Sequence, residues 1–129
     1  MKRILIIDDE KDIRFLLSTI LVDEGYETLQ AGTVEEAEDI IGNKAFDLAI
    51  VDISLKDKKK DGIFLLKEIK KINKHIPVLM ISGHATIQLA VDSMKLGAYE
   101  FLEKPFNKDR LLNFAKRALE SFDLQNQNK

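Results

Sequence analysis

Short apolar runs alternate with segments of helical periodicity along the chain, and this alternation constrains the fold more than any other feature. Three runs contain no charged residue and end next to a polar side chain: residues 4–7, 48–51 and 77–81. Such runs are typical of strands that are buried on both faces of a parallel sheet. Two weaker strand candidates lie at residues 26–31 and 99–102.

Between these runs, apolar residues recur at the spacing of one helix face and predict five helices. Thr33 and Glu36 predict a capping box at the start of the second helix. Gly97 predicts the end of the fourth helix, and Asn107 predicts the N-cap of the fifth. The apolar positions that define the five helices are Ile13, Leu16, Leu17, Ile20 and Leu21; Val34, Ala37, Ile40 and Ile41; Ile63, Leu66, Ile69 and Ile72; Ile87, Ala90, Val91 and Met94; and Leu111, Ala115, Ala118, Leu119 and Phe122.

Strict alternation of strand and helix predicts the fold class, an α/β domain with a doubly wound, five-stranded parallel sheet of (βα)5 flavodoxin-like topology. A length of 129 residues suits one such domain. We assign this domain to residues 1–122. Residues 123–129 have little apolar surface to bury, and we expect a frayed tail or the start of a linker to a further domain.

The composition excludes several classes of function. Hydrophobic residues make up 45% and charged residues 33% of the chain, as in ordinary soluble domains. The formal net charge of −2 argues against nucleic acid as a ligand of this domain. The absence of cysteine excludes disulfides and thiolate metal sites. No run is long enough for a signal peptide or a membrane span, so we expect a cytoplasmic protein without membrane contact.

Complementary polar residues follow four of the predicted strands. Asp8 and Asp9 follow the first strand, Asp52 the third, Ser82 the fourth and Lys104 the fifth. Because ligands of doubly wound sheets bind at the carboxyl ends of the strands, we expect these side chains to share one crevice. Each residue alone is better explained as a turn, a helix cap or a solvated surface residue. The functional interpretation depends on their convergence.

The predicted crevice has the chemistry of a metal and phosphate site. Three neighbouring carboxylates repel one another unless a cation neutralises them, and an open site with oxygen ligands suits Mg²⁺. A carboxylate beside Mg²⁺ can attack phosphorus and form an aspartyl phosphate. An ammonium such as that of Lys104 would offset charge on phosphoryl oxygens, and the Ser82 hydroxyl would donate a hydrogen bond.

Five segments in this order carry a family resemblance: residues 7–10, 51–53, 61–62, 81–85 and 97–106. With these motifs, the chain resembles the CheY-like receiver domain of two-component response regulators along nearly its whole length. The resemblance to NtrX-type nitrogen-response regulators is closer still. It implies a sigma-54-dependent ATPase module and a DNA-binding module outside these 129 residues.

The resemblance implies a role for each candidate residue in the acidic part of the site. Asp52 would be the phosphoacceptor. Asp9 and Asp52 would coordinate Mg²⁺, with Asp8 acting directly or through water. The backbone carbonyl of Ser54 would supply a further ligand.

The resemblance also implies how the phosphoryl group is sensed. Ser82 and Lys104 would contact it, and Phe101 would be the switch aromatic residue. The bond between Lys104 and Pro105 is expected to be cis. His84 occupies a position that tunes the lifetime of the phosphoryl group in receivers, although a surface histidine without such a role is nearly as well supported.

As a receiver, the domain would act as a regulatory switch rather than as an enzyme. A sensor histidine kinase would supply the phosphoryl group. Phosphorylation would alter the surface formed by the fourth helix, the fifth strand and the fifth helix, which could also form a homodimer. One departure from the family is a longer loop at residues 56–60, rich in lysine. The simpler interpretation is a solvated loop. The alternative is a positively charged surface that steers an acidic partner, such as a kinase, toward the site.

Three alternatives remain at this point. A Mg²⁺-dependent phosphohydrolase of the haloacid dehalogenase type needs a second aspartate two residues after the nucleophile, where this chain has Ser54. A flavodoxin-like FMN carrier shares the predicted fold, but the acidic residues 8–10 would repel the phosphate of FMN. A pseudo-receiver that only docks to a partner would not need a complete acidic site.

Overall fold

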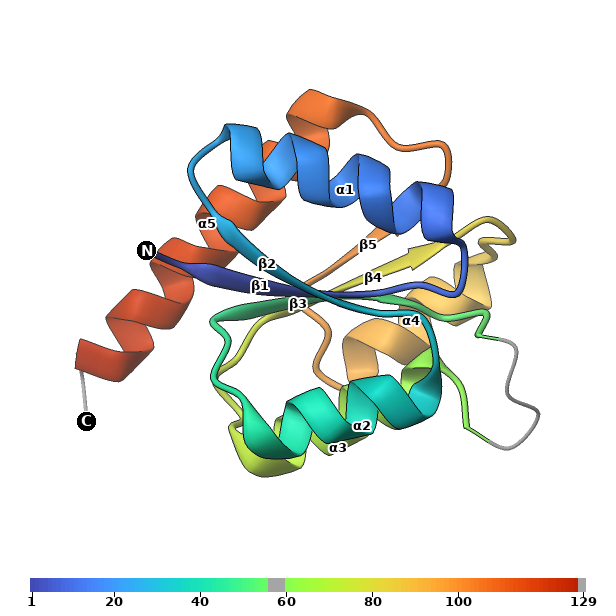
Figure 1. Ribbon diagram of the computed structural model, residues 1–129. Coiled ribbons are helices and arrows are strands. Elements are labelled where there is room, and N and C mark those ends of the chain that lie inside the picture. Colours follow the sequence, from blue (N-terminus) through green and yellow to red (C-terminus); the bar gives the residue numbers. More distant parts are fainter. Residues whose placement is uncertain (56–59, 128–129) are drawn as a thin grey trace.

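The structure, a computed structural model, describes residues 1–55 and 60–127 and contains one five-stranded parallel sheet (Figure 1). The strand order is β2-β1-β3-β4-β5, so the order reverses between β1 and β3. This arrangement confirms the predicted doubly wound α/β fold. The strands are β1 (Arg3–Ile7), β2 (Glu27–Ala31), β3 (Leu48–Asp52), β4 (Val78–Ser82) and β5 (Glu100–Glu103).

Helices cover both faces of the sheet. In Figure 1, α1 and α5 lie above the sheet, whereas α2, α3 and α4 lie below it. This division follows from right-handed crossovers on either side of the point where the strand order reverses. The helices are α1 (Lys11–Asp23), α2 (Val34–Asn43), α3 (Gly62–Ile72), α4 (Ile87–Lys95) and α5 (Lys108–Gln127).

The central strands form the core because both of their faces are apolar. Every residue of β3 and β4 is buried, as are the last four residues of β1. Alternate side chains divide between two layers: Ile6 and Ile50 pack with α1 and α5, whereas Leu5 and Ala49 pack with α2 and α3. Buried strands therefore hold the polar residues at their carboxyl ends: Asp8 directly after β1, Asp52 at the end of β3 and Ser82 at the end of β4.

The sequence signals for helix ends are confirmed. The Thr33 hydroxyl accepts a hydrogen bond from the Glu36 amide at 3.1 Å. The Asn107 side chain accepts one from the Arg110 amide, also at 3.1 Å. Gly97 follows α4 with a φ of 102°, a conformation that glycine adopts without steric cost.

Two of the predicted helix faces are only partly buried. Leu16 shares the apolar periodicity of α1, yet it is 46% exposed. The buried residues of that helix are Leu17 and Leu21. The apolar stripe of α4 also lies largely outside the core: Ile87 is 86% exposed, and Ser93 is the buried residue of this helix. Periodicity therefore predicted the helices but not how deeply each one packs.

The C-terminal helix continues past the boundary expected at residue 122. Phe122 is buried, Leu124 is 60% exposed, and the helix extends to Gln127. The division into residues 1–122 and 123–129 stays a prediction. Within the described ranges, no helix has both the length and the apolar character needed to cross a membrane.

Candidate functional site

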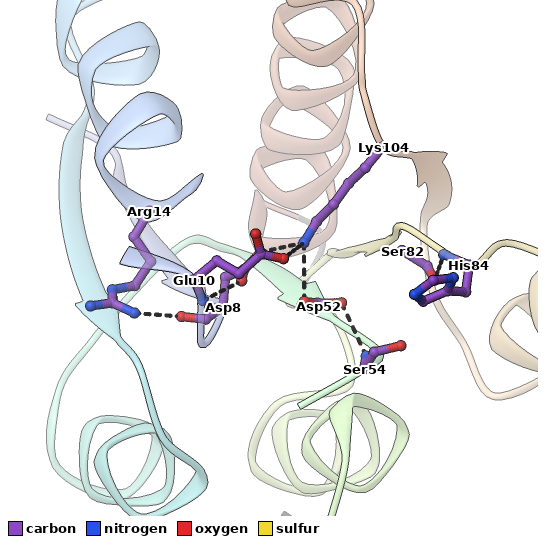
Figure 2. A network of polar contacts seen from close by, with 8 residues as sticks. All are labelled: Asp8, Glu10, Arg14, Asp52, Ser54, Ser82, His84 and Lys104. Carbon is purple, nitrogen blue, oxygen red and sulfur yellow. Dashed lines mark hydrogen bonds and ion pairs between the residues drawn. The ribbon is translucent and has the colours of Figure 1, made fainter. Parts of the chain in front are cut away.

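The sheet register brings together Asp8, which follows β1, and Asp52, which ends β3. Ile7 of β1 pairs with Val51 of β3, so Asp8 and Asp52 occupy neighbouring positions at the carboxyl edge. Ser82 closes β4 on the other side of β3. Lys104 follows β5 and reaches back across this edge toward both carboxylates (Figure 2). The predicted convergence of these residues is thus present in the structure.

Asp8 is fully buried, and its two carboxylate oxygens have different environments. Oδ1 accepts a hydrogen bond from the Glu10 amide at 2.8 Å. Oδ2 lies 2.8 Å from Lys104 Nζ, within ion-pair distance, but it has no partner in hydrogen-bond geometry among the described residues. The Lys104 ammonium compensates the charge of this buried oxygen, and because no hydrogen bond occupies the oxygen, it can also serve as a ligand to a metal ion.

Asp52 is 2% exposed and lies between a backbone amide and an ammonium group. Its Oδ1 atom accepts a hydrogen bond from the Ser54 amide at 3.0 Å, and its Oδ2 atom lies 3.1 Å from Lys104 Nζ. The hydrogen bond and the ion pair fix the orientation of the carboxylate at the end of a fully buried strand. The structure shows contact through the amide of Ser54, and the role expected for its carbonyl stays a prediction.

Burial and charge shift the pKa values of two groups in this cluster. Burial raises the pKa of the Asp8 carboxyl, and the charge of Asp52 adds to this effect, against the opposing ion pair with Lys104 and the hydrogen bond from the Glu10 amide. Burial alone would lower the pKa of Lys104, but its ion pairs with Asp8 and Asp52 raise it above its usual range. The two carboxylates therefore favour the charged form of Lys104, while burial opposes the charged form of Asp8.

The site has more negative than positive charge. One carboxylate oxygen from each of Asp8, Asp9, Glu10 and Asp52 lies within 4.8 Å of the others. Among the described residues, Lys104 is the cation that pairs with this cluster. A dense set of hard oxygen donors, including the Asp8 oxygen without a hydrogen bond, fits a divalent cation such as Mg²⁺.

Glu10 is a member of this cluster that the sequence analysis did not single out. Its carboxylate is exposed, and Oε1 lies 3.4 Å from Lys104 Nζ. Its position directly after Asp9 was the available signal. Arg14 was also missed; it lies four residues after Glu10, one helical turn along, and its Nη1 atom donates a hydrogen bond to the backbone carbonyl of Asp8 at 2.7 Å.

Ser82 is the last residue of β4, the strand next to the one that carries Asp52, and Phe101 lies in β5. Ser82 is fully buried, and its hydroxyl oxygen accepts a hydrogen bond from the His84 amide at 3.0 Å (Figure 2). Phe101 is half-buried, pairs with Met80 in the sheet and packs against the core on the α2 and α3 side. The expected cis bond between Lys104 and Pro105 is present.

The lysine-rich loop can be described only at its end. Lys56, Asp57, Lys58 and Lys59 lie outside the described residues. Lys60 pairs with Glu38 of α2 at 3.3 Å, and its ammonium lies 5.1 Å from the centre of the Phe64 ring. The steering role considered for this loop stays a prediction.

Comparisons with known proteins agree with this geometry. The model of the response regulator receiver domain family matches residues 4–116. The nitrogen assimilation regulatory protein NtrX of Azorhizobium caulinodans is 46% identical over 122 residues, which are 95% of this chain and 27% of that protein. The narrower resemblance to NtrX-type regulators is therefore confirmed.

Solved structures show the same likeness. The receiver domain of NtrX from Brucella abortus is 50% identical, with a TM-score of 0.85 over 91% of this chain and 98% of that one. The beryllofluoride-activated NtrC4 receiver domain dimer is 41% identical, with a TM-score of 0.88 over 95% of this chain and 99% of that one.

The chain spans about a quarter of the length of the curated NtrX relatives that it matches. These relatives therefore relate this chain to one segment of a longer regulator. The family match, the strand order and the acidic cluster lead to the same assignment. The chain belongs to the response regulator receiver domain family and is a regulatory switch domain similar to those of NtrX regulators.

Proposed function

We propose that this domain accepts a phosphoryl group on Asp52 and that Mg²⁺ is required for the transfer. The observation that supports this most directly is the pairing of Asp52 Oδ2 with Lys104 Nζ at 3.1 Å, beside the buried carboxylate of Asp8. A nucleophilic carboxylate, an ammonium and additional acidic ligands are the groups that phosphoryl transfer to aspartate needs.

The transfer forms one bond and breaks one. A carboxylate oxygen of Asp52 forms a bond to phosphorus, while the bond from phosphorus to a nitrogen of the donor histidine breaks and its electron pair stays on that imidazole. The product adds roughly two negative charges to an acidic site. Lys104 already lies between Asp8 and Asp52, and its charge would offset part of this increase.

Mg²⁺ would be held by the carboxylates of Asp8, Asp9 and Asp52 and by the backbone carbonyl of Ser54. The cluster of carboxylates within 4.8 Å and the buried Asp8 oxygen without a hydrogen bond support this set of ligands. When bound, the ion would neutralise carboxylate repulsion and charge on the phosphoryl oxygens. Because few protein ligands are available, we expect weak binding, with Asp9→Ala weakening it most among the acids that follow β1.

Ser82 and Phe101 would couple the phosphoryl group to the surface of the domain. The Ser82 hydroxyl would donate a hydrogen bond to the phosphoryl group, and Lys104 would pair with it. Phe101, in the next strand, would move together with the loop that follows Ser82. The switching surface is then α4, β5 and α5, where α4 presents exposed apolar side chains.

A sensor histidine kinase is the proposed donor, and α4, β5 and α5 are the proposed homodimer surface. A related NtrC4 receiver was solved as an activated dimer, which supports a homodimer but does not identify its surface. By similarity to NtrX, residues 1–122 would form the receiver and residues 123–129 would lead to a sigma-54-dependent output module that acts on transcription in the cytoplasm. The domain would also promote its own dephosphorylation, without sustained turnover of small phosphate esters.

The test is phosphorylation with a small acyl phosphate and Mg²⁺, measured by intact mass. Wild-type protein should gain one phosphoryl group, and it should not do so when Mg²⁺ is chelated. Asp52→Asn should gain none, whereas Asp47→Asn, at the opposite edge of the sheet, should behave as wild type. The assignment of Asp52 is wrong if Asp52→Asn gains the same mass. Unchanged backbone NMR shifts at residues 83–106 on phosphorylation would contradict the switching surface.

A further inference from the structure

The backbone of Asp8 is held from both sides by groups outside the acidic cluster. Its amide donates to the carbonyl of Ala31 at the end of β2, at 3.1 Å. Its carbonyl accepts from Arg14 Nη1 of α1 at 2.7 Å. Figure 2 shows Arg14 approaching Asp8 from the side opposite Lys104. The loop of residues 8–10, which supplies three of the four clustered carboxylates, is thus attached to both α1 and β2.

A glycine makes room for this arginine. A Cβ atom added at Gly32 would lie 2.6 Å from Arg14 Nη1 and 3.0 Å from Arg14 Cζ. The guanidinium group therefore packs directly on the backbone of the loop between β2 and α2. Gly32 does not have a positive φ, so its own backbone does not require glycine. A side chain at this position would displace the Arg14 guanidinium group.

Because the loop of residues 8–10 is short, the hydrogen bond from Arg14 to the Asp8 carbonyl also restricts the positions of the neighbouring carboxylates. Asp8 Oδ1 accepts from the Glu10 amide, and the Arg14 amide donates to the Glu10 carbonyl at 3.1 Å. Asp9 lies between Asp8 and Glu10, whose backbones are both held by hydrogen bonds. Its own carboxylate belongs to the cluster of mutually repelling carboxylates. If the Asp8 carbonyl were free, repulsion among the carboxylates could be relieved by movement of this loop away from β3.

We propose that Arg14 is a positioning residue for the metal: its hydrogen bond to the Asp8 carbonyl holds residues 8–10 in the arrangement that binds Mg²⁺. This inference rests on the proposed function, because it concerns the same ion. Groups that orient metal ligands typically change metal affinity by about 10–100-fold when they are removed. Arg14 does not touch the reacting atoms, so its effect should be on Mg²⁺ affinity rather than on transfer at saturating Mg²⁺.

Charge and geometry predict opposite results for Arg14→Met. Removing a positive charge beside a cation site would by itself strengthen Mg²⁺ binding. Losing the hydrogen bond would weaken it. We expect the Kd for Mg²⁺ to rise by about tenfold, a result that loss of charge cannot explain. Arg14→Lys retains a charged donor and should recover part of the affinity.

Gly32→Ala tests the same contact without altering the charge. The new methyl group would meet the end of a flexible side chain, so Arg14 moves while the fold remains. We expect weaker Mg²⁺ binding than in wild type. The double variant Arg14→Met with Gly32→Ala should bind Mg²⁺ as Arg14→Met does, because the contact can be lost only once. Additive effects would show that the two residues act independently.

Arg3→Met is the matched control. Arg3 also donates to a backbone carbonyl, that of Ala45 at 3.3 Å, but at the opposite edge of the sheet. The Arg3→Met substitution should lower the free energy of unfolding without weakening Mg²⁺ binding. A readout without metal is the hydrogen exchange of the Glu10 amide, which should become faster in Arg14→Met and Gly32→Ala but not in Arg3→Met.

The outcomes separate this inference from the proposed function. If wild type binds Mg²⁺ and both Arg14→Met and Gly32→Ala bind it equally well, the role of Arg14 is wrong and the proposed function stands. If wild type neither binds Mg²⁺ nor accepts a phosphoryl group, the proposed function fails. Glu10 exchange then still decides whether Arg14 orders the loop: unchanged exchange in both variants would overturn that as well.

Discussion

The ammonium nitrogen of Lys104 lies 2.8 Å from the buried Oδ2 atom of Asp8, across the carboxyl edge of the sheet. The same nitrogen also contacts Asp52 and Glu10, at 3.1 and 3.4 Å. One cation thus offsets several carboxylates that the fold holds together. The site is therefore arranged around a shortage of positive charge.

Lys104→Met should lower the free energy of unfolding of the metal-free protein. The lysine side chain is 12% exposed and pairs with two buried carboxylates, and removing one partner of a buried pair typically costs about 3 kcal/mol. Urea denaturation at neutral pH measures this loss. Lys71→Met is the control, because Lys71 pairs with Glu68 on the surface, where such pairs contribute about 0.5 kcal/mol. Equal losses in the two variants would contradict the argument.

Asp8 should make the metal-free protein less stable as the pH rises. Burial raises the pKa of Asp8 above its ordinary value of 3.8, so the folded state favours the protonated form. The unfolded chain releases this proton first as the pH increases. Stability therefore falls between the ordinary pKa and the raised one, and the cost of ionised Asp8 is complete above the raised pKa. Mg²⁺ should offset this cost by favouring the ionised form.

Asp8→Asn tests this pH dependence. At neutral pH without metal, it should raise the free energy of unfolding by more than the roughly 0.5 kcal/mol typical of a surface substitution. Asp47→Asn is a matched control, since Asp47 also accepts a backbone amide, that of Arg3, at 2.8 Å, but outside the cluster. Denaturation at a series of pH values from acidic to neutral gives the free energy of unfolding as a function of pH. This dependence on pH should become weaker in Asp8→Asn and stay unchanged in Asp47→Asn. An unchanged slope in that variant would refute the assignment to Asp8.

Gly62→Ala should destabilise the protein and disturb the acceptor. An added Cβ would lie 2.3 Å from the carbonyl oxygen of Asp52 and 2.6 Å from the Cα of Ile53, and backbone atoms at the end of a buried strand cannot easily yield. We expect a loss of about 2 kcal/mol and slower phosphorylation by a small donor. Gly42→Ala, in α2 with open space around its Cα, should instead gain about 0.5 kcal/mol. Thermal unfolding of both variants provides the comparison.

Ser93→Ala should stabilise the protein. Ser93 is fully buried in α4, and its hydroxyl has no hydrogen-bond partner among residues 1–55 and 60–127. Removing an unpaired buried hydroxyl should raise the free energy of unfolding by about 1 kcal/mol. Ser18→Ala should change it by a similar amount in the opposite direction, because the Ser18 hydroxyl lies 2.7 Å from that of Thr28. Destabilisation by Ser93→Ala would show that this hydroxyl has a partner.

The sequence was sufficient to predict features that depend on a few neighbouring residues or on the order of the strands in the sheet. Apolar runs predicted the buried strands, and capping residues such as Thr33 and Asn107 predicted helix starts. Strand order then placed Asp8, Asp52 and Lys104 at one edge. These predictions succeeded because a doubly wound fold leaves little choice about where strand ends meet.

Features that depend on how one element packs against another were not predictable. Leu16 continues the apolar period of α1 yet is exposed, since periodicity does not reveal how wide the buried stripe is. The contact of Arg14 with the Asp8 carbonyl requires a particular side-chain direction and a glycine 18 positions further along the chain, at residue 32. Glu10 was overlooked because an exposed glutamate is ordinarily a solvated residue.

The shallow packing of α4 has a consequence for hydrogen exchange. Strands β3 and β4 are completely buried, so their amides should exchange only when the whole domain unfolds. Helix α4 has one buried residue, and its amides should exchange through local opening at a much smaller free energy. The domain therefore has two separate levels of protection against exchange. A change of charge at the strand ends can alter the opening of α4 without bringing the sheet closer to unfolding.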